Sequence, residues 1–265
     1  MLPTLLTLGN VLCGFGAITL SAKWGGFDQN TSLFAAACLI YMAMVFDALD
    51  GSAARWTKQT SEFGAQLDSL CDAISFGAAP AFLMLQFSVP YGYHPRLLWL
   101  AAGLYVVCTV LRLARFNVEE EDENLPGLFS GLPSPAAAGV VASFPVMVFG
   151  PQLLAYSDYD LVWAEFAATL DAVAVRTLPL IAFAVACLMV SRVRYLHLFQ
   201  TFVRGRRNGP YLIKLVFALV MIVAAPRISA PLICCWYAFA TPVWALWDKH
   251  LRRFILRRPP AAEVR

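Results

Sequence analysis

Long apolar stretches separated by short polar connections dominate the hydrophobic pattern of this chain. A membrane-spanning helix needs roughly 20 mainly apolar residues, and eight stretches approach that length. They lie at about 4–23, 32–50, 64–89, 97–116, 134–154, 173–191, 210–226 and 229–247. The connections are rich in Gly, Pro and charged residues, and the segment 157–176 is predicted to be one of them. The pattern predicts an all-α fold, a polytopic membrane helix bundle of about eight transmembrane helices.

The composition supports a membrane environment. Of the 265 residues, 60% are hydrophobic and 14% are charged, whereas a soluble domain carries about 25% charged residues. A soluble chain of this length has too little interior to hide so much apolar surface. The seven cysteines are scattered through apolar stretches without a Cys-x-x-Cys pair, so no disulfide framework is expected. We expect lipid as the surrounding partner and no nucleic acid.

The distribution of Lys and Arg predicts the orientation in the membrane. In an eight-helix topology, 16 of the 20 basic residues fall on one side, and only Lys23, Arg96, Arg176 and Arg227 fall on the other. The positive-inside rule then places both termini and the loop 51–63 in the cytoplasm. Residues 1–248 are expected to form one membrane-embedded domain, with catalytic helices at about 32–89, and residues 249–265 a basic cytoplasmic tail. The first apolar stretch is interpreted as a retained membrane helix rather than a signal peptide.

Four carboxylates lie where the second and third apolar stretches approach the cytoplasmic side. Asp47 and Asp50 are three residues apart, and Asp68 and Asp72 are four apart. Either spacing places both side chains on one helix face. Charged residues inside spanning helices are costly and mark functional sites. Because the predicted loop 51–63 is short, the two helices should lie antiparallel, with their acidic faces toward each other.

Four facing carboxylates would repel one another strongly in a medium of low dielectric constant. Hard divalent cations with oxygen ligands would neutralise them. Oxygen ligands suit both Mg²⁺ and Mn²⁺, and two such ions form a common clamp for displacement at phosphorus. The pattern therefore predicts a site for Mg²⁺ or Mn²⁺, with two ions. One carboxylate could act as a general base. A proton or cation pathway in a transporter is the alternative.

Small residues and an arginine surround the acidic pairs and favour an enzyme over a transporter. Gly51 and Gly64 have no side chain and Ala54 has only a methyl group, so a bulky ligand could approach the helix backbones closely. Arg55 is placed to meet phosphate oxygens, which its planar, permanently charged guanidinium binds well.

The complete pattern from residue 47 to residue 72 is Asp-x₂-Asp-Gly-x₂-Ala-Arg-x₈-Gly-x₃-Asp-x₃-Asp. It resembles the signature of the CDP-alcohol phosphotransferase family at every position. The resemblance implies that Asp47, Asp50 and Asp68 are the principal metal ligands and that Asp72 is the general base and also touches a metal. It further implies a cytidine diphosphate site lined by Gly51, Ala54, Arg55 and Gly64. It also implies attack of an alcohol on the lipid-bearing phosphorus with release of CMP, and a homodimer.

Further stretches are similar to the phosphatidylserine synthase branch of that family. They are residues 8–15, 68–81, 111–117 and 131–138. The similarity implies CDP-diacylglycerol and L-serine as substrates and phosphatidylserine as the product. Sister enzymes that use glycerol phosphate or inositol phosphate as the acceptor remain the alternative.

Four further residues are candidates for binding the acceptor or the lipid phosphate. Arg112 and Arg115 are three residues apart on one helix face and could receive the serine carboxylate or a phosphate. Asn117 could add a hydrogen bond. Ser75 follows Asp72 by three residues and could contact the substrate. The competing interpretation makes the arginines positive-inside anchors and Ser75 a helix-packing residue.

Overall fold

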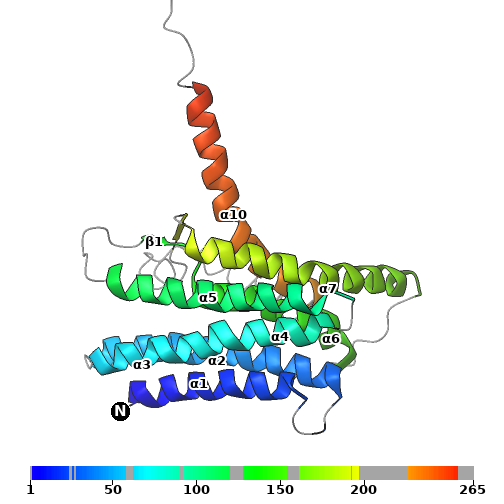
Figure 1. Ribbon diagram of the computed structural model, residues 1–265, viewed down its shortest axis with the longest axis horizontal. Helices are drawn as coiled ribbons and strands as arrows, with labels where there is room; N and C mark the ends of the chain where they lie inside the picture. Colours follow the sequence, from blue (N-terminus) through cyan, green and yellow to red (C-terminus); the bar gives the residue numbers. More distant parts are fainter. Residues whose placement is uncertain are drawn as a thin grey trace, which may run out of the picture.

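The computed structural model describes residues 2–23, 26, 28–57, 62–89, 92–119, 128–153, 161–191, 193–196 and 226–255. Its helices are α1 (Leu2–Ser21), α2 (Gln29–Thr57), α3 (Glu62–Asp72), the π-helix η1 (Ala73–Ala78), α4 (Ala79–Ser88), α5 (Pro95–Glu119), α6 (Ser134–Leu153), α7 (Leu161–Val190) and α10 (Pro226–Ile255). Helices α1 to α7 lie roughly parallel in one bundle (Figure 1). The strands β1 (Leu128–Ser130) and β2 (Arg194–Leu196) pair antiparallel.

The structure confirms the expected helical architecture with several helices that could span a membrane. Among the described residues, five helical stretches are long and apolar enough to cross a membrane, namely Thr4–Ser21, Gln29–Ala53, Phe63–Ser88, Pro95–Asn117 and Thr169–Val190. A shorter apolar helix, Ser134–Phe149, corresponds to the predicted span 134–154. The predicted span 229–247 lies within α10, and the predicted span 210–226 lies outside the described residues except for its last position. A count of eight spans therefore stays a prediction.

Two predicted connections are largely helical. The segment 157–176 was predicted as a connection, but α7 begins at Leu161 and continues through it. Charged residues such as Glu165 and Arg176 interrupt the apolar run, yet neighbouring Ala and Leu favour a helix. The predicted loop 51–63 is also shorter, because α2 continues to Thr57 and α3 begins at Glu62.

Large apolar side chains cover the outside of the bundle. On α1, Leu5, Leu8, Leu12 and Phe15 are between 42% and 68% exposed, and their spacing places them on one helix face. Helix α5 exposes further apolar residues, among them Trp99. Exposed apolar surface on this scale is unfavourable in water and favourable against hydrocarbon. The burial pattern therefore agrees with a multi-pass integral membrane protein.

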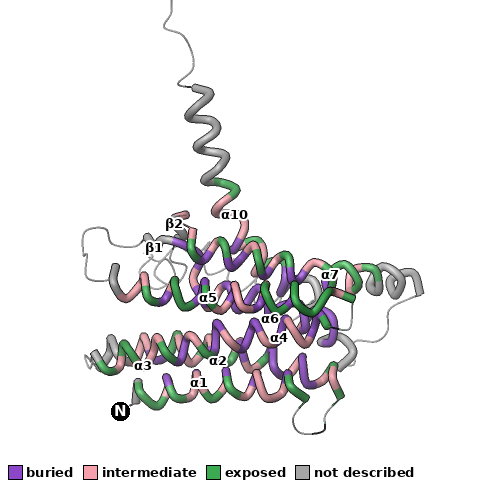
Figure 2. Tube along the Cα trace, in the orientation of Figure 1, coloured by how far each residue is buried: buried purple, intermediate pink, exposed green. Residues whose placement is uncertain are grey.

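Helix α6 runs through the core of the bundle. It packs against α2, α7 and α10, and its small residues from Ala137 to Ala142 are almost completely buried (Figure 2). Tyr41 of α2 donates a hydrogen bond to the carbonyl oxygen of Gly139, 2.9 Å away. Small residues in α6 allow this close approach, as they do in other membrane helix pairs.

The predicted span 64–89 is continuous but contains one turn of π-helix. Helix α3 ends at Asp72, and η1 follows directly before α4 begins. Turns of this kind are rare and occur frequently at functional sites. Helix α1 crosses this turn closely, because Ser75 Oγ donates to the carbonyl oxygen of Asn10 at 3.0 Å. The carboxylate of Asp72 thus lies where the helical register changes.

Gly14 of α1 makes the close crossing possible, and we expect Gly14→Ala to destabilise the protein. A Cβ atom there would lie 2.7 Å from the backbone Cα of Ser75, too close for either atom. Overpacking of this kind typically costs about 1–3 kcal/mol. Thermal unfolding in detergent should show a lowered Tm. Gly103→Ala is the matched control, because no atom lies within 4 Å of the added methyl; an equal fall in Tm there would contradict the argument.

Candidate active site

Helices α2 and α3 bring three of the predicted carboxylates together. Asp47, Asp50 and Asp68 each offer an oxygen that lies within 4.8 Å of the other two. Asp50 is only 5% exposed, and Asp47 and Asp68 are half-buried. The three-residue spacing places Asp47 and Asp50 on one face of α2, and their oxygens meet that of Asp68 on α3. The predicted acidic cluster therefore forms across α2 and α3.

Asp72 lies one turn beyond Asp68 and has a different environment. It is 7% exposed and interacts electrostatically with Asp47 and Asp68. Its Oδ1 accepts a hydrogen bond of 3.0 Å from Nδ2 of Asn10 on α1. It is not a member of the group of three whose oxygens lie within 4.8 Å. The four carboxylates therefore divide into a compact group of three and a separately held fourth.

Arg112 of α5 faces the same group. Its guanidinium interacts electrostatically with Asp72 and Asp47. Its Nη1 donates a hydrogen bond of 2.7 Å to Ser134 Oγ, and the guanidinium lies 5.5 Å from the ring centroid of Phe116. An arginine stacked on an aromatic ring and bonded to a hydroxyl is held in one orientation, with further N–H groups left to donate.

The other predicted acceptor residues lie nearby with different partners. Asn117 and Ser69 of α3 are hydrogen-bonded at 3.0–3.2 Å, which ties the end of α5 to the acidic helix. Ser75 is fully buried, and its hydroxyl donates to the backbone of α1. Arg115 is half-buried at the same end of α5. Arg112, Arg115 and Asn117 therefore share one end of α5, whereas Ser75 contacts α1.

The predicted cytidine diphosphate residues lie at the adjoining ends of α2 and α3. Gly51 directly follows Asp50 in α2, and Gly64 lies in the first turn of α3. Positions 54 and 55 belong to α2, but the side chains of Ala54 and Arg55 lie outside the described part of the chain. The backbone thus puts the four positions beside the acidic cluster.

The cluster fits a hard divalent metal ion. All its donors are carboxylate oxygens, which Mg²⁺ and Mn²⁺ prefer. Oδ2 of Asp50 is buried and has no hydrogen-bond partner in the described part of the chain. A buried anionic oxygen without a donor is costly, and a cation would remove that cost. The residues present therefore suit the metal expected from the signature.

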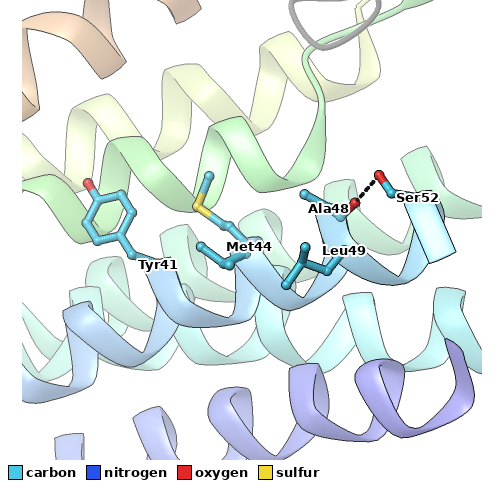
Figure 3. Close-up of a pocket in the computed structure, with 6 residues that line it drawn as sticks. Tyr41, Met44, Ala48, Leu49 and Ser52 are labelled. Carbon is cyan, nitrogen blue, oxygen red and sulfur yellow. Dashed lines mark hydrogen bonds between the residues drawn. The ribbon is translucent and has the colours of Figure 1, made fainter. Parts of the chain in front are cut away.

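An apolar hollow of about 410 Å³ lies on another face of α2. It is lined by Tyr41, Met44, Val45, Ala48, Leu49 and Ser52 (Figure 3). Residues 48 and 50 are two apart and so project about 200° from each other around the helix. Ser52 Oγ donates a hydrogen bond to the Ala48 carbonyl oxygen at 2.8 Å. The hollow therefore lies on a different face of α2 from the carboxylates.

Sequence reasoning missed two polar residues of α1 that touch the acidic cluster. Asn10 bonds to Asp72, and the side chain of Thr7 hydrogen-bonds to Asp50. They are three residues apart in an otherwise apolar helix, so they share one face. Polar side chains in a spanning helix usually face protein partners, and this signal could have identified them. Ser134, the partner of Arg112, lies in the stretch 131–138 that is similar to the phosphatidylserine synthase branch, but the sequence alone assigns it no role.

Comparison with known proteins agrees with this geometry. The family model of CDP-alcohol phosphatidyltransferases matches residues 1–170. The archaetidylserine synthase of Methanothermobacter thermautotrophicus is 40% identical over 159 residues, covering 58% of this chain and 61% of that protein. The CDP-diacylglycerol–serine O-phosphatidyltransferase of Methanocaldococcus jannaschii is 37% identical over 139 residues, covering 52% and 57%. The enzyme of that name from Helicobacter pylori is 37% identical over 142 residues, covering 53% and 55%.

These matches span 55% to 61% of the relatives' own lengths. The family match covers more than half of this chain and includes α1, α2, α3 and α5, the helices that carry the carboxylates, Asn10 and Arg112. Sequence signature, site geometry and family match agree, and the protein belongs to the CDP-alcohol phosphatidyltransferase family.

Proposed function

We propose that this protein transfers a phosphatidyl group from CDP-diacylglycerol to the hydroxyl of L-serine and releases CMP. The observation that carries the proposal is the compact group of Asp47, Asp50 and Asp68 beside the separately held Asp72. This division suits a metal-binding set and a general base. The names of the relatives, a serine phosphatidyltransferase and an archaetidylserine synthase, support serine as the acceptor.

The proposed reaction is one displacement at phosphorus. Asp72 accepts the proton of the serine hydroxyl while the hydroxyl oxygen forms a bond to the lipid-bearing phosphorus. The bond from that phosphorus to the bridging oxygen of the diphosphate breaks, and CMP leaves with the bond electrons. Asp47, Asp50 and Asp68, with Asp72 at the edge, would hold Mg²⁺ or Mn²⁺, in two sites. Bound ions would supply positive charge to the diphosphate and the departing phosphate.

The nucleotide would lie at the adjoining ends of α2 and α3. Gly51, Ala54 and Gly64 leave the backbone accessible there, and Arg55 would contact phosphate oxygens. These roles come from the family resemblance, and the position of the four residues beside the acidic cluster supports them.

The acceptor would bind between α3 and α5. Arg112 is oriented by Ser134 and Phe116 and interacts with Asp72, so it could receive the serine carboxylate next to the base. Arg115 and Asn117 would complete this side. Ser75 would act through its hydrogen bond to α1 rather than by touching the substrate. Glycerol phosphate and inositol phosphate, the alternative acceptors, are doubly anionic and would need a more basic pocket than serine does.

The finer membrane arrangement is part of the same proposal. It comprises eight spans, both termini in the cytoplasm, residues 1–248 as one membrane domain and 249–265 as a basic tail. The protein would lie in the cytoplasmic membrane as a homodimer. Its active site would face the cytoplasm. The bias of 16 basic residues to four supports the orientation.

The experiment that tests the function measures CMP release from CDP-diacylglycerol by the purified protein. We expect release to need both L-serine and Mg²⁺ or Mn²⁺, and to stop when a chelator is added. Unlabelled glycerol phosphate and inositol phosphate should not compete with labelled serine. Release with either of these but not with serine would move the protein to a sister activity. Ion flux in liposomes without any CMP release would favour a transporter instead.

A further inference from the structure

Asn10 of α1 is a fully buried amide in a mainly apolar helix. Its exposed fraction is 0%, and it lies 62 residues from its hydrogen-bond partner, Asp72. Among the described residues, the hydrogen bond of the Asn10 side chain goes to Asp72 and not to another residue of α1. Burying an amide costs free energy unless it is hydrogen-bonded, so the bond to Asp72 accounts for its presence.

The amide is oriented with its nitrogen toward the carboxylate. Nδ2 lies 3.0 Å from Asp72 Oδ1, and Asn10 Oδ1 is buried with no hydrogen-bond partner in the described residues. Turning the amide over would place two oxygen acceptors against each other. The Asn10 amide therefore serves as a donor to one particular oxygen of Asp72.

Backbone contacts of α1 fix the position of this donor relative to the carboxylate. The carbonyl oxygen of Asn10 accepts a hydrogen bond from Ser75, three residues beyond Asp72. One turn later Gly14 lies against Ser75 with no room for a methyl group. Two contacts to the π-helical turn thus position Asn10 relative to the end of α3, where Asp72 lies.

We propose that Asn10 is a positioning residue for Asp72. By occupying Oδ1, it fixes the plane of the carboxylate and leaves Oδ2 to face the acceptor hydroxyl. The inference rests on the proposed function, because it assumes that Asp72 takes the proton of the acceptor. A misplacement of about 1 Å in a reacting group can cost about 10²-fold in rate, so a single hydrogen bond to the base has a measurable effect on turnover.

A double-mutant cycle between the two residues tests the proposal. The variants are Asn10→Ala, Asn10→Leu, Asp72→Asn and the Asn10→Ala and Asp72→Asn pair combined. Leu fills the space of the amide without a polar atom, so it separates loss of the hydrogen bond from loss of packing. Ser21→Ala is the matched control, because Ser21 is also buried in α1 and its Oγ donates only to the Ala17 carbonyl at 2.7 Å.

We expect Asn10→Ala and Asn10→Leu each to lower kcat by about 10- to 100-fold, as removal of an orienting partner typically does. The Kd for CDP-diacylglycerol and the Tm of Asn10→Leu should stay near the wild-type values. In the Asp72→Asn background, Asn10→Ala should change kcat by less than about twofold, because residues that act through one group are not additive. Ser21→Ala should keep wild-type kcat.

Three outcomes would overturn the proposal. An equal loss from Asn10→Ala in both backgrounds would show that Asn10 acts independently of Asp72. Unchanged kcat in both Asn10 variants would show that the bond is dispensable. A fall in kcat that tracks a weaker Kd for CDP-diacylglycerol and a lower Tm would show a structural role only. The cycle uses whichever acceptor alcohol the wild-type protein turns over, so a failure of serine as the acceptor is distinguished from a failure of this coupling.

Discussion

Asp72→Asn is expected to lower turnover by about 10²–10⁴-fold, the usual effect of losing a general base. The amide has nearly the same shape as the carboxylate and can still meet Asn10, but it cannot accept the proton of serine. Because Asp72 lies outside the compact group of three carboxylates, binding of CDP-diacylglycerol should largely persist. The measurement is single-turnover CMP release, paired with equilibrium binding of the CDP-lipid to the same sample.

The pairing of the two measurements makes this result informative. Loss of CDP-lipid binding together with turnover would assign Asp72 to the metal or nucleotide site instead. Turnover close to the wild-type rate would remove Asp72 from the role of base altogether. In either case the carboxylate that accepts the proton would have to be sought among Asp47, Asp50 and Asp68.

Asp50→Asn is expected to lower both metal affinity and turnover, the latter by at least about 10³-fold, because a bound ion contributes several kcal/mol to stabilising charge in the transition state. Asp50 is the most buried of the compact group, and its Oδ2 has no hydrogen-bond partner in the described residues. An amide there would remove one negative charge and one ligand. Mn²⁺ titration, followed by spin resonance of the free ion and by CMP release, measures both effects.

Asp28→Asn is the matched control for this prediction. Asp28 precedes the same helix at its other end, where it accepts hydrogen bonds from the backbone and side chain of Thr31. These bonds favour the ionised form and lower the pKa of Asp28. Asparagine is an equally good N-cap, so Mn²⁺ binding and turnover should stay unchanged. If Asp50→Asn bound Mn²⁺ with wild-type affinity and released CMP at the wild-type rate, the assignment of Asp50 as a ligand would be wrong.

The amino-acid sequence predicted the grouping of the carboxylates better than the ends of the helices. Spacings of three and four residues predict that each acidic pair shares one helix face, and the structure brings Asp47, Asp50 and Asp68 together. Helix ends were less predictable. Charges near residues 165–176 and the glycine at 51 predict interruptions, but α7 and α2 continue through them. Local composition is a weak guide to helix ends because packing and capping decide them.

Residues on separate helices could not be paired from the sequence. Periodicity shows which side chains share a face, but it does not say which faces meet. Arg112 and Arg115 were equivalent candidates, and the tertiary structure shows Arg112 bonded to Ser134 and directed toward Asp72 and Asp47. The π-helical turn after Asp72 was equally hidden, since its sequence reads as an ordinary apolar helix.

The sequence by itself determined the membrane class, the helical architecture and the four carboxylates, because hydropathy and helical spacing are local properties of the chain. Only the tertiary structure decided how those carboxylates divide. It places three within 4.8 Å of one another and bonds the fourth to Asn10, 62 positions away. That contact depends on the close crossing of α1 over η1 at Gly14 and Ser75, and such a crossing is set by the packing of whole helices rather than by any short stretch of sequence.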